Sequence, residues 1–157
     1  MIQATLCFVF REKPEPAVLL GYKKRGFGVG KYDGFGGKLQ DGETLTQAAL
    51  RELLEESGLI VEPHNLIPFG QIKFVFPYKP IWDQEVHLFS AWEWCGTPAE
   101  SEEMRPHWFS IDSLPFSQMW DDSHYWMPYL LQNQSINASF VLDRDNETVK
   151  DFSIQLL

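Results

Sequence analysis

Cysteines, basic residues and long apolar runs are all scarce in this chain of 157 residues. The two cysteines, Cys7 and Cys95, have neither metal-ligand nor CxxC spacing, and we expect both to be buried free thiols. Lysine and arginine number 13 against 22 aspartates and glutamates, which gives a net charge of -9. Because phosphate backbones attract basic surfaces, this charge argues against a binder of nucleic acid polymers.

The chain also lacks a recognisable membrane or export signal. No apolar run approaches the roughly 18 residues that a helix needs to span a bilayer. The apolar first ten residues have no basic n-region and meet the charged segment 11–13 too early for a signal peptide. We expect a cytoplasmic protein without a membrane partner, and a monomer.

The composition is typical of one globular domain, which we expect to span residues 1–157. Hydrophobic residues make up 44% of the sequence and aromatic residues 15%, so disordered, collagen-like and coiled-coil chains are excluded. A domain of this length buries roughly 70% of its unfolded surface and needs no disulfide or metal to fold.

Hydrophobic patterning predicts a mixed α/β fold in which strands outnumber helices. A helix is expected from Thr44, near a capping position, to Ser57, with Gly58 as its stop signal. Segment 26–37 holds six glycines in twelve residues, too many for a regular element, and segment 108–109 is a short strand at best. The other expected elements are strands at 5–10, 17–23, 67–76 and 85–94, a helix at 123–132, and a hairpin of 139–142 with 148–157.

The expected helix carries Glu52, Glu55 and Glu56 at i, i+3 and i+4, so three carboxylates share one face. An acidic face is often only a solvated surface. This one follows a glycine-rich loop, where backbone can approach a ligand closely, and Arg51 lies within reach of Glu55 and of Glu43. Convergent carboxylates suit Mg²⁺ or Mn²⁺, which leave sites for substrate phosphate. The residues therefore indicate metal-assisted phosphate chemistry.

These residues belong to a pattern of 23 residues that resembles the Nudix box at every fixed position. The matching residues are Gly37, Glu43, Arg51, Glu52, Leu53, Glu55, Glu56, Gly58 and Leu59. The resemblance implies the Nudix fold, an α/β/α sandwich with a mixed β-sheet and a catalytic loop–helix–loop. It also implies Mg²⁺-dependent hydrolysis of a nucleoside diphosphate linked to another group, with Mn²⁺ as the alternative metal.

The same resemblance implies roles for single residues. The three helical glutamates would bind the metal ion, with Glu56 or Glu52 as the general base. Arg51 would orient a carboxylate by ion pairing. The carbonyl of Gly36 or Gly37 would complete the metal shell.

Outside the box, the chain resembles the MutT-homologue oxidised purine nucleoside triphosphatases from about residue 17 to residue 132. The stretches that carry this resemblance are Gly21–Gly28, Asp33–Lys38, Gly96–Pro106 and Pro115–Trp120. They imply hydrolysis of 8-oxo-dGTP and, in the animal type, of 2-hydroxy-dATP to monophosphate and pyrophosphate, and Glu103 as a further metal ligand. The substrate-binding residues expected from this resemblance are Thr5, Lys23, Phe27, Asp33, Phe35, Gly36, Gly37, Lys38, Trp120, Asp121 and Asp122.

Two departures from this subgroup concern the base. Asp33 stands where the animal enzymes carry Asn, so it could accept from a purine N–H, be protonated itself, or be only a turn residue. The animal enzymes have Trp, Pro and two Asp, whereas here Trp120 is followed by Asp121, Asp122 and Ser123. Either the acid pair shifts by one residue to share a proton at the base, or one carboxylate is lost and the acids serve as a helix cap.

Other readings stay open. In the first strand, Thr5 faces the nucleotide if segment 11–16 holds an insertion, and Phe8 takes that place if it does not. The substrate could be an unmodified nucleotide or a dinucleoside polyphosphate. A catalytically silent Nudix module that senses nucleotides is the alternative outside enzymes, although every box glutamate is present.

Overall fold

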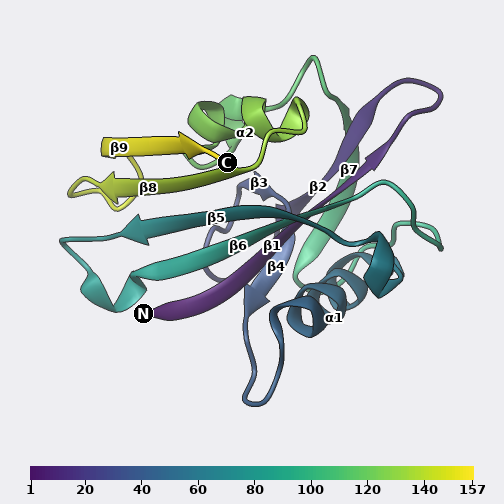
Figure 1. The fold of residues 1–157 in the computed structure, drawn as a ribbon, viewed down its shortest axis with the longest axis horizontal. Helices are drawn as coiled ribbons and strands as arrows, with labels where there is room; N and C mark the ends of the chain where they lie inside the picture. Colours follow the sequence, from purple (N-terminus) through teal and green to yellow (C-terminus); the bar gives the residue numbers. More distant parts are fainter.

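The computed structural model describes residues 1–157 and contains a mixed sheet of nine strands with two helices, α1 (Leu45–Ser57) and α2 (Ser123–Leu131). The strands are β1 Ile2–Arg11, β2 Ala17–Lys23, β3 Tyr32–Asp33, β4 Phe35–Lys38, β5 Ile67–Val75, β6 Gln84–Ala91, β7 Met104–Ser110, β8 Ile136–Leu142 and β9 Val149–Leu156. Their order is β3, β2, β1, β6, β5, β8 and β9, with β4 also paired to β1 and β7 to β2. Figure 1 shows α1 and α2 on opposite sides of this sheet.

Strand β1 is central because neighbours cover both of its edges. It pairs in parallel with β6 along one edge, and antiparallel with β4 and then β2 along the other. The pair of β5 with β8 is also parallel, which makes the sheet mixed. Side chains alternate between the two faces: Phe8 and Phe10 belong to one apolar cluster, and Cys7 and Val9 to another.

Each apolar cluster is covered by one helix. Ala49 and Leu53 of α1 are fully buried in the cluster that contains Cys7. Trp126 and Met127 of α2 are buried in the cluster on the other face. Helices therefore cover both faces of a mixed sheet, and the predicted α/β/α sandwich is confirmed.

Helix α1 begins and ends where the sequence predicts. The hydroxyl of Thr44 accepts a hydrogen bond from the Gln47 amide, and the Gln47 side chain accepts one from the Thr44 amide. At the other end Gly58 adopts the left-handed conformation, φ 77°, and its amide donates to the Leu54 carbonyl. Both ends are fixed locally, so the spacing of the helical glutamates is fixed as well.

The glycine-rich segment was predicted to contain no regular element, and this was wrong. Residues 26–31 do contain no helix or strand, but residues 32–33 form β3, and residues 35–37 with Lys38 form β4, which pairs with β1. A Cβ atom on Gly36 would lie 1.7 Å from the carbonyl oxygen of Thr5, so glycine is what allows the two strands to approach. At this position the lack of a side chain serves close strand packing.

Two further predictions were wrong. Segment 108–109 was expected to be a short strand at best, but β7 runs over seven residues and pairs with the whole of β2. Arg105 and Pro106 interrupt its apolar pattern, which hid the strand. Cys7 is buried as expected, whereas Cys95 is exposed, because it forms only an isolated bridge with Ile60 outside the main sheet.

The remaining elements are short. Helix α2 contains Pro128, as the sequence indicated, and spans nine residues. Neither helix combines the length and apolarity needed to cross a membrane. Three 3-10 turns are present: η1 Pro63–Asn65, η2 Pro80–Trp82 and η3 Phe116–Gln118.

Replacing the capping residue should weaken α1 measurably. Thr44→Ala removes the hydroxyl that accepts from the Gln47 amide, and should lower the free energy of unfolding by about 1 kcal/mol in urea denaturation. Thr46→Ala, two residues later and inside the helix, is the matched control and should not destabilise, because alanine has the higher helix propensity. An equal loss in both variants would contradict the capping role.

Candidate active site

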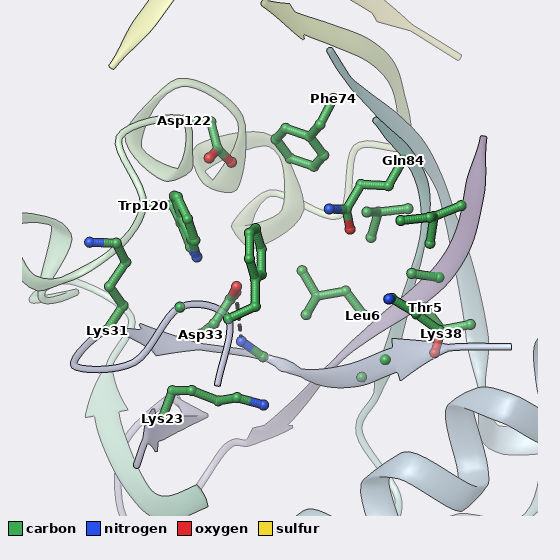
Figure 2. A pocket seen from close by; sticks show the side chains of 18 of the residues that line it. Thr5, Leu6, Lys23, Lys31, Asp33, Lys38, Phe74, Gln84, Trp120 and Asp122 are labelled. Atoms are coloured by element: carbon green, nitrogen blue, oxygen red, sulfur yellow. Dashed lines mark hydrogen bonds between the residues drawn. The ribbon is translucent and has the colours of Figure 1, made fainter. Parts of the chain in front are cut away.

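A cavity of about 380 Å³ extends from the first residues of α2, past β3 and β4, to Glu56 on helix α1. Figure 2 shows Asp122 and Trp120 on one side, Lys23 on the opposite side, and Asp33 between them. The wall is formed by several strands and both helices, so the cavity exists only in the folded chain. Its two ends differ chemically, and each is described in turn.

The first end carries two carboxylates, each with one oxygen hydrogen-bonded to the protein. Asp33 Oδ1 accepts from the Gly34 amide at 2.8 Å. Asp122 Oδ2 accepts from the indole Nε1 of Trp126 at 2.8 Å. The second oxygen of Asp33 has no hydrogen bond within the chain, and both residues line the cavity. Asp122 makes no cap hydrogen bond to α2, so the alternative of a simple helix cap is not realised.

Burial makes these two carboxyls easy to protonate. Burial and the nearby negative charge of Asp122 raise the pKa of Asp33 to about 7, although the Gly34 amide and Lys23 act in the opposite direction. Burial also raises the pKa of Asp122 to about 6, against the effect of the hydrogen bond from Trp126. Near neutral pH this end of the cavity can therefore offer both a hydrogen-bond donor and an acceptor.

Aromatic rings close this end. The Phe27 ring stacks on Trp120 with centroids 5.1 Å apart and meets the edge of Trp82 at 4.9 Å. The Lys31 ammonium lies 5.1 Å from the Trp120 ring centroid. Flat aromatic faces beside paired hydrogen-bonding groups suit a planar heterocycle.

The second end combines cationic and anionic side chains. Glu56 Oε1 accepts from the Gly36 amide at 2.9 Å, and Lys23 Nζ lies 3.8 Å from Glu56 Oε2. The same ammonium lies 3.3 Å from Glu103, which also accepts from Arg25 at 2.8 Å. Burial raises the pKa of Glu56 to about 8, and Lys23 opposes this rise. A carboxyl with such a pKa can take up and release a proton near neutral pH.

Arg51 joins the loop, the strand and the helix around this end. Its guanidinium contacts both oxygens of Glu43, lies 2.9 Å from Glu52 and 3.3 Å from Glu55, and donates to the Lys38 carbonyl. The hydrogen bonds from Arg51 lower the pKa of Glu43 to about 2. The pairing of Arg51 with Glu43, which depended on the loop folding back, is present.

The residues suit a divalent cation by their chemistry. No three acidic, histidine or cysteine side chains converge closely enough to enclose a metal ion, because lysine and arginine groups hold the carboxylates. The Lys23 ammonium lies between Glu56 and Glu103 and marks a place where positive charge is favourable. Glu52 packs against Gly37, where an added Cβ would lie 2.7 Å from its oxygen. Glu55 is the most exposed of the three helical glutamates.

The cavity brings together most of the expected substrate-binding residues. Thr5 lines it, and its hydroxyl is buried without a hydrogen-bond partner, whereas Phe8 lies in the core. Thr5 is therefore the residue that faces the cavity. The other expected residues in the wall are Lys23, Phe27, Asp33, Gly36, Gly37, Lys38, Trp120 and Asp122.

Two expected substrate contacts do not reach the cavity. Phe35 is fully buried in the cluster beneath α1, because strand alternation turns its side chain to that face. Asp121 accepts a hydrogen bond from the Val149 amide at 2.8 Å, so it holds β9 and does not line the cavity. The acid pair is therefore Asp33 with Asp122, from different parts of the chain, and not two neighbours.

Several wall residues were not predicted from the sequence. They come from strands, turns or helix α2, and the sequence did not indicate which of their side chains face the cavity. The one feature of the sequence that could have indicated them is the group of aromatic residues in and just before η2, which includes Phe76 and Trp82. The unpredicted wall residues include Lys31, Phe74, Phe76, Trp82, Gln84, Ser123 and Trp126.

Comparison with known proteins agrees with this geometry. A family model described as the NUDIX domain matches residues 2–130. The chain is 50% identical over 138 residues to the oxidized purine nucleoside triphosphate hydrolase of Mus musculus, covering 88% of this chain and 86% of the mouse protein. It is 58% identical over 123 residues to the protein of the same name from Danio rerio, covering 78% and 77% of the two chains.

A solved structure extends the likeness to the whole fold. The MutT protein of Bacillus halodurans has a TM-score of 0.84 to this chain and covers 99% of it, and 98% of that chain is covered in turn. At 23% identity, this likeness concerns the fold alone. The domain match and the identity to the two vertebrate proteins show that this chain belongs to the Nudix family.

Proposed function

We propose that this protein hydrolyses oxidised purine nucleoside triphosphates, such as 8-oxo-dGTP or 2-hydroxy-dATP, to monophosphate and pyrophosphate. The observation that supports this most directly is one cavity with an aromatic and acidic end and an end where Lys23 lies beside Glu56. Two relatives that share at least half of their aligned residues carry the name of this activity. Such an enzyme would remove damaged nucleotides before a polymerase uses them.

We further propose that Mg²⁺, or Mn²⁺ in its place, is the cofactor. Nudix proteins use a divalent cation, and the donors available here are hard carboxylate and carbonyl oxygens. When bound, such a cation supplies positive charge to phosphate oxygens and acidifies nearby water. The residues proposed to hold it are Glu52, Glu55, Glu56 and Glu103, with the carbonyl of Gly36 or Gly37.

The chain's own residues then have separate tasks in hydrolysis. Lys23 neutralises phosphate charge, since its ammonium lies between Glu56 and Glu103 at this end. Glu56 Oε1 is held by the Gly36 amide, so Oε2 is the atom that accepts the proton of the attacking water. Arg51 fixes the direction of Glu52 and with it the alternative base. Water adds to phosphorus as the anhydride bond between the monophosphate and pyrophosphate parts of the substrate breaks, and Glu56 takes up the proton.

The purine ring of the nucleotide is proposed to lie at the other end of the cavity, against Trp120. Asp33 and Asp122 both line this end, and a protonated carboxyl donates where an ionised one accepts. The unpartnered Thr5 hydroxyl is available for the sugar. Lys38 borders the same wall.

Product analysis tests the proposal directly. Purified protein with Mg²⁺ is given 8-oxo-dGTP, 2-hydroxy-dATP, dGTP, dATP and a dinucleoside polyphosphate in separate reactions. We expect the oxidised purines to have the highest kcat/KM and to give monophosphate with pyrophosphate. Equal turnover of dGTP and dATP, or preference for the dinucleoside compound, would overturn the substrate but retain Nudix chemistry. Tight binding without any phosphate release would favour the sensing module.

Loss of the proposed base should abolish turnover and spare the fold. Glu56→Gln keeps the acceptor for the Gly36 amide but cannot take up a proton, so kcat should fall by roughly 100-fold or more. The melting temperature should not fall, because a buried neutral amide replaces a buried acid. Glu62→Gln, an exposed acid outside the site, is the control. A Glu56→Gln enzyme with parental kcat would remove Glu56 from the mechanism.

Asp33, the buried acid proposed to face the purine, should lower the stability of the folded protein as the pH rises. The pKa of Asp33 is about 7 in the folded chain and ordinary when unfolded, so the unfolded state loses its proton first between about pH 4 and 7. Asp33→Asn cannot ionise. Its free energy of unfolding relative to the parent should therefore increase by about 1–3 kcal/mol from pH 4 to pH 8. Asp41→Asn, at an exposed turn, is the control, and a difference independent of pH would contradict the burial effect.

A further inference from the structure

Residues beyond 130 lie outside the matched family domain, yet they reach the nucleotide cavity. Strand β8 pairs in parallel with β5, and Leu142 at its end lines the cavity wall. In the turn that follows, residues 143–148, the central residues 145–147 line a second hollow together with Phe27 and Trp120. Figure 1 shows the β8–β9 hairpin beside α2, at one side of the sheet.

The turn has a defined conformation. The Asp143 amide donates a hydrogen bond to the Thr148 carbonyl at 2.8 Å, which closes the turn between β8 and β9. Asp145 Oδ1 accepts from the amides of Glu147 and Thr148 at 3.0 and 2.8 Å. The side chain of Glu147 therefore starts from a fixed backbone position.

Two contacts connect this turn to Trp120. Glu147 Oε1 lies 3.2 Å from Lys31 Nζ, and that ammonium lies 5.1 Å from the Trp120 ring centroid. The Val149 amide donates to Asp121, the residue that follows Trp120, at 2.8 Å. The Trp120 ring thus lies beside an ammonium that Glu147 contacts, and the side chain of the next residue, Asp121, is bonded to the start of β9.

We propose that the turn 143–148 is a positioning element for the nucleotide base, and that Glu147 sets nucleotide affinity by holding Lys31 against Trp120. The proposal rests on the proposed function, because Trp120 is taken as the surface on which the base stacks. The side-chain contact of Glu147 is with Lys31, and it has no hydrogen bond or ion pair with the box residues. Its effect should therefore appear in KM and not in kcat.

Asp121, which was expected to contact the substrate, has a different role in this arrangement. Asp121 is absent from the cavity wall and is instead the acceptor that ties the start of β9 to the residue after Trp120. A hydrogen bond to a carboxylate is stronger than one between neutral groups. Asp121 is accordingly a second positioning residue, acting on the backbone where Glu147 acts on the ring.

Glu147→Gln tests the proposal, with Asp151→Asn as the matched control. Both remove one carboxylate charge from the same hairpin, but Asp151 accepts only from the Phe152 amide and has no contact with Lys31. For the oxidised purine triphosphate, Glu147→Gln should raise KM by about two- to five-fold at unchanged kcat, the effect of one partly exposed ion pair. Hydrogen exchange of the amides in residues 24–31 should accelerate in Glu147→Gln and not in Asp151→Asn.

A double-mutant cycle separates positioning from general charge effects. Lys31→Met keeps apolar contact with Trp120 but removes the charge, so adding Glu147→Gln to it should change KM no further. Multiplicative effects in the double variant, or equal behaviour of Glu147→Gln and Asp151→Asn, would overturn the proposal. If the parent hydrolyses no oxidised purine, the proposed function fails. The exchange rates still decide the restraint, since unchanged exchange in residues 24–31 refutes it and faster exchange upholds it.

Discussion

The rest of the site depends on the contacts that the guanidinium of Arg51 makes. It contacts Glu43 in the loop before α1, Glu52 within the helix and the carbonyl of Lys38 at the end of β4. Because its donors form a rigid planar fork, one side chain fixes loop, helix and strand relative to each other. It also compensates the repulsion among several carboxylates, which would otherwise oppose their gathering at one place.

The catalytic end could be predicted because its signals are local. The start and end of α1 depend on Thr44, Gln47 and Gly58, all within the segment itself, and helical spacing then places the glutamates on one face. The same holds for β1 and β2, whose apolar runs mark them as buried strands. Only the pairing of Arg51 with Glu43 required the loop to fold back, and their spacing made that conceivable.

The residues at the other end were mostly expected, but their arrangement could not be predicted, because contacts far apart in the sequence determine it. Asp122 raises the pKa of Asp33, which is 89 positions away, whereas the sequence suggested only its neighbour Asp121 as the second acid of a pair. Phe35 was placed on the wrong face, since its direction follows from the register of β4 on β1. That register in turn depends on Gly36, which looked like a loop residue until its strand partner was known.

The two ends of the cavity come from different segments, and this separation bears on how the protein can evolve. Substitutions at Asp33 or among residues 120–123 alter the surface that faces the base, while the charge network of α1 stays intact. Substitutions at one end therefore leave the contacts at the other end in place, so substrate choice and hydrolysis can vary separately. Position 33, where the animal enzymes that the sequence resembles carry an amide, lies outside the charge network of α1.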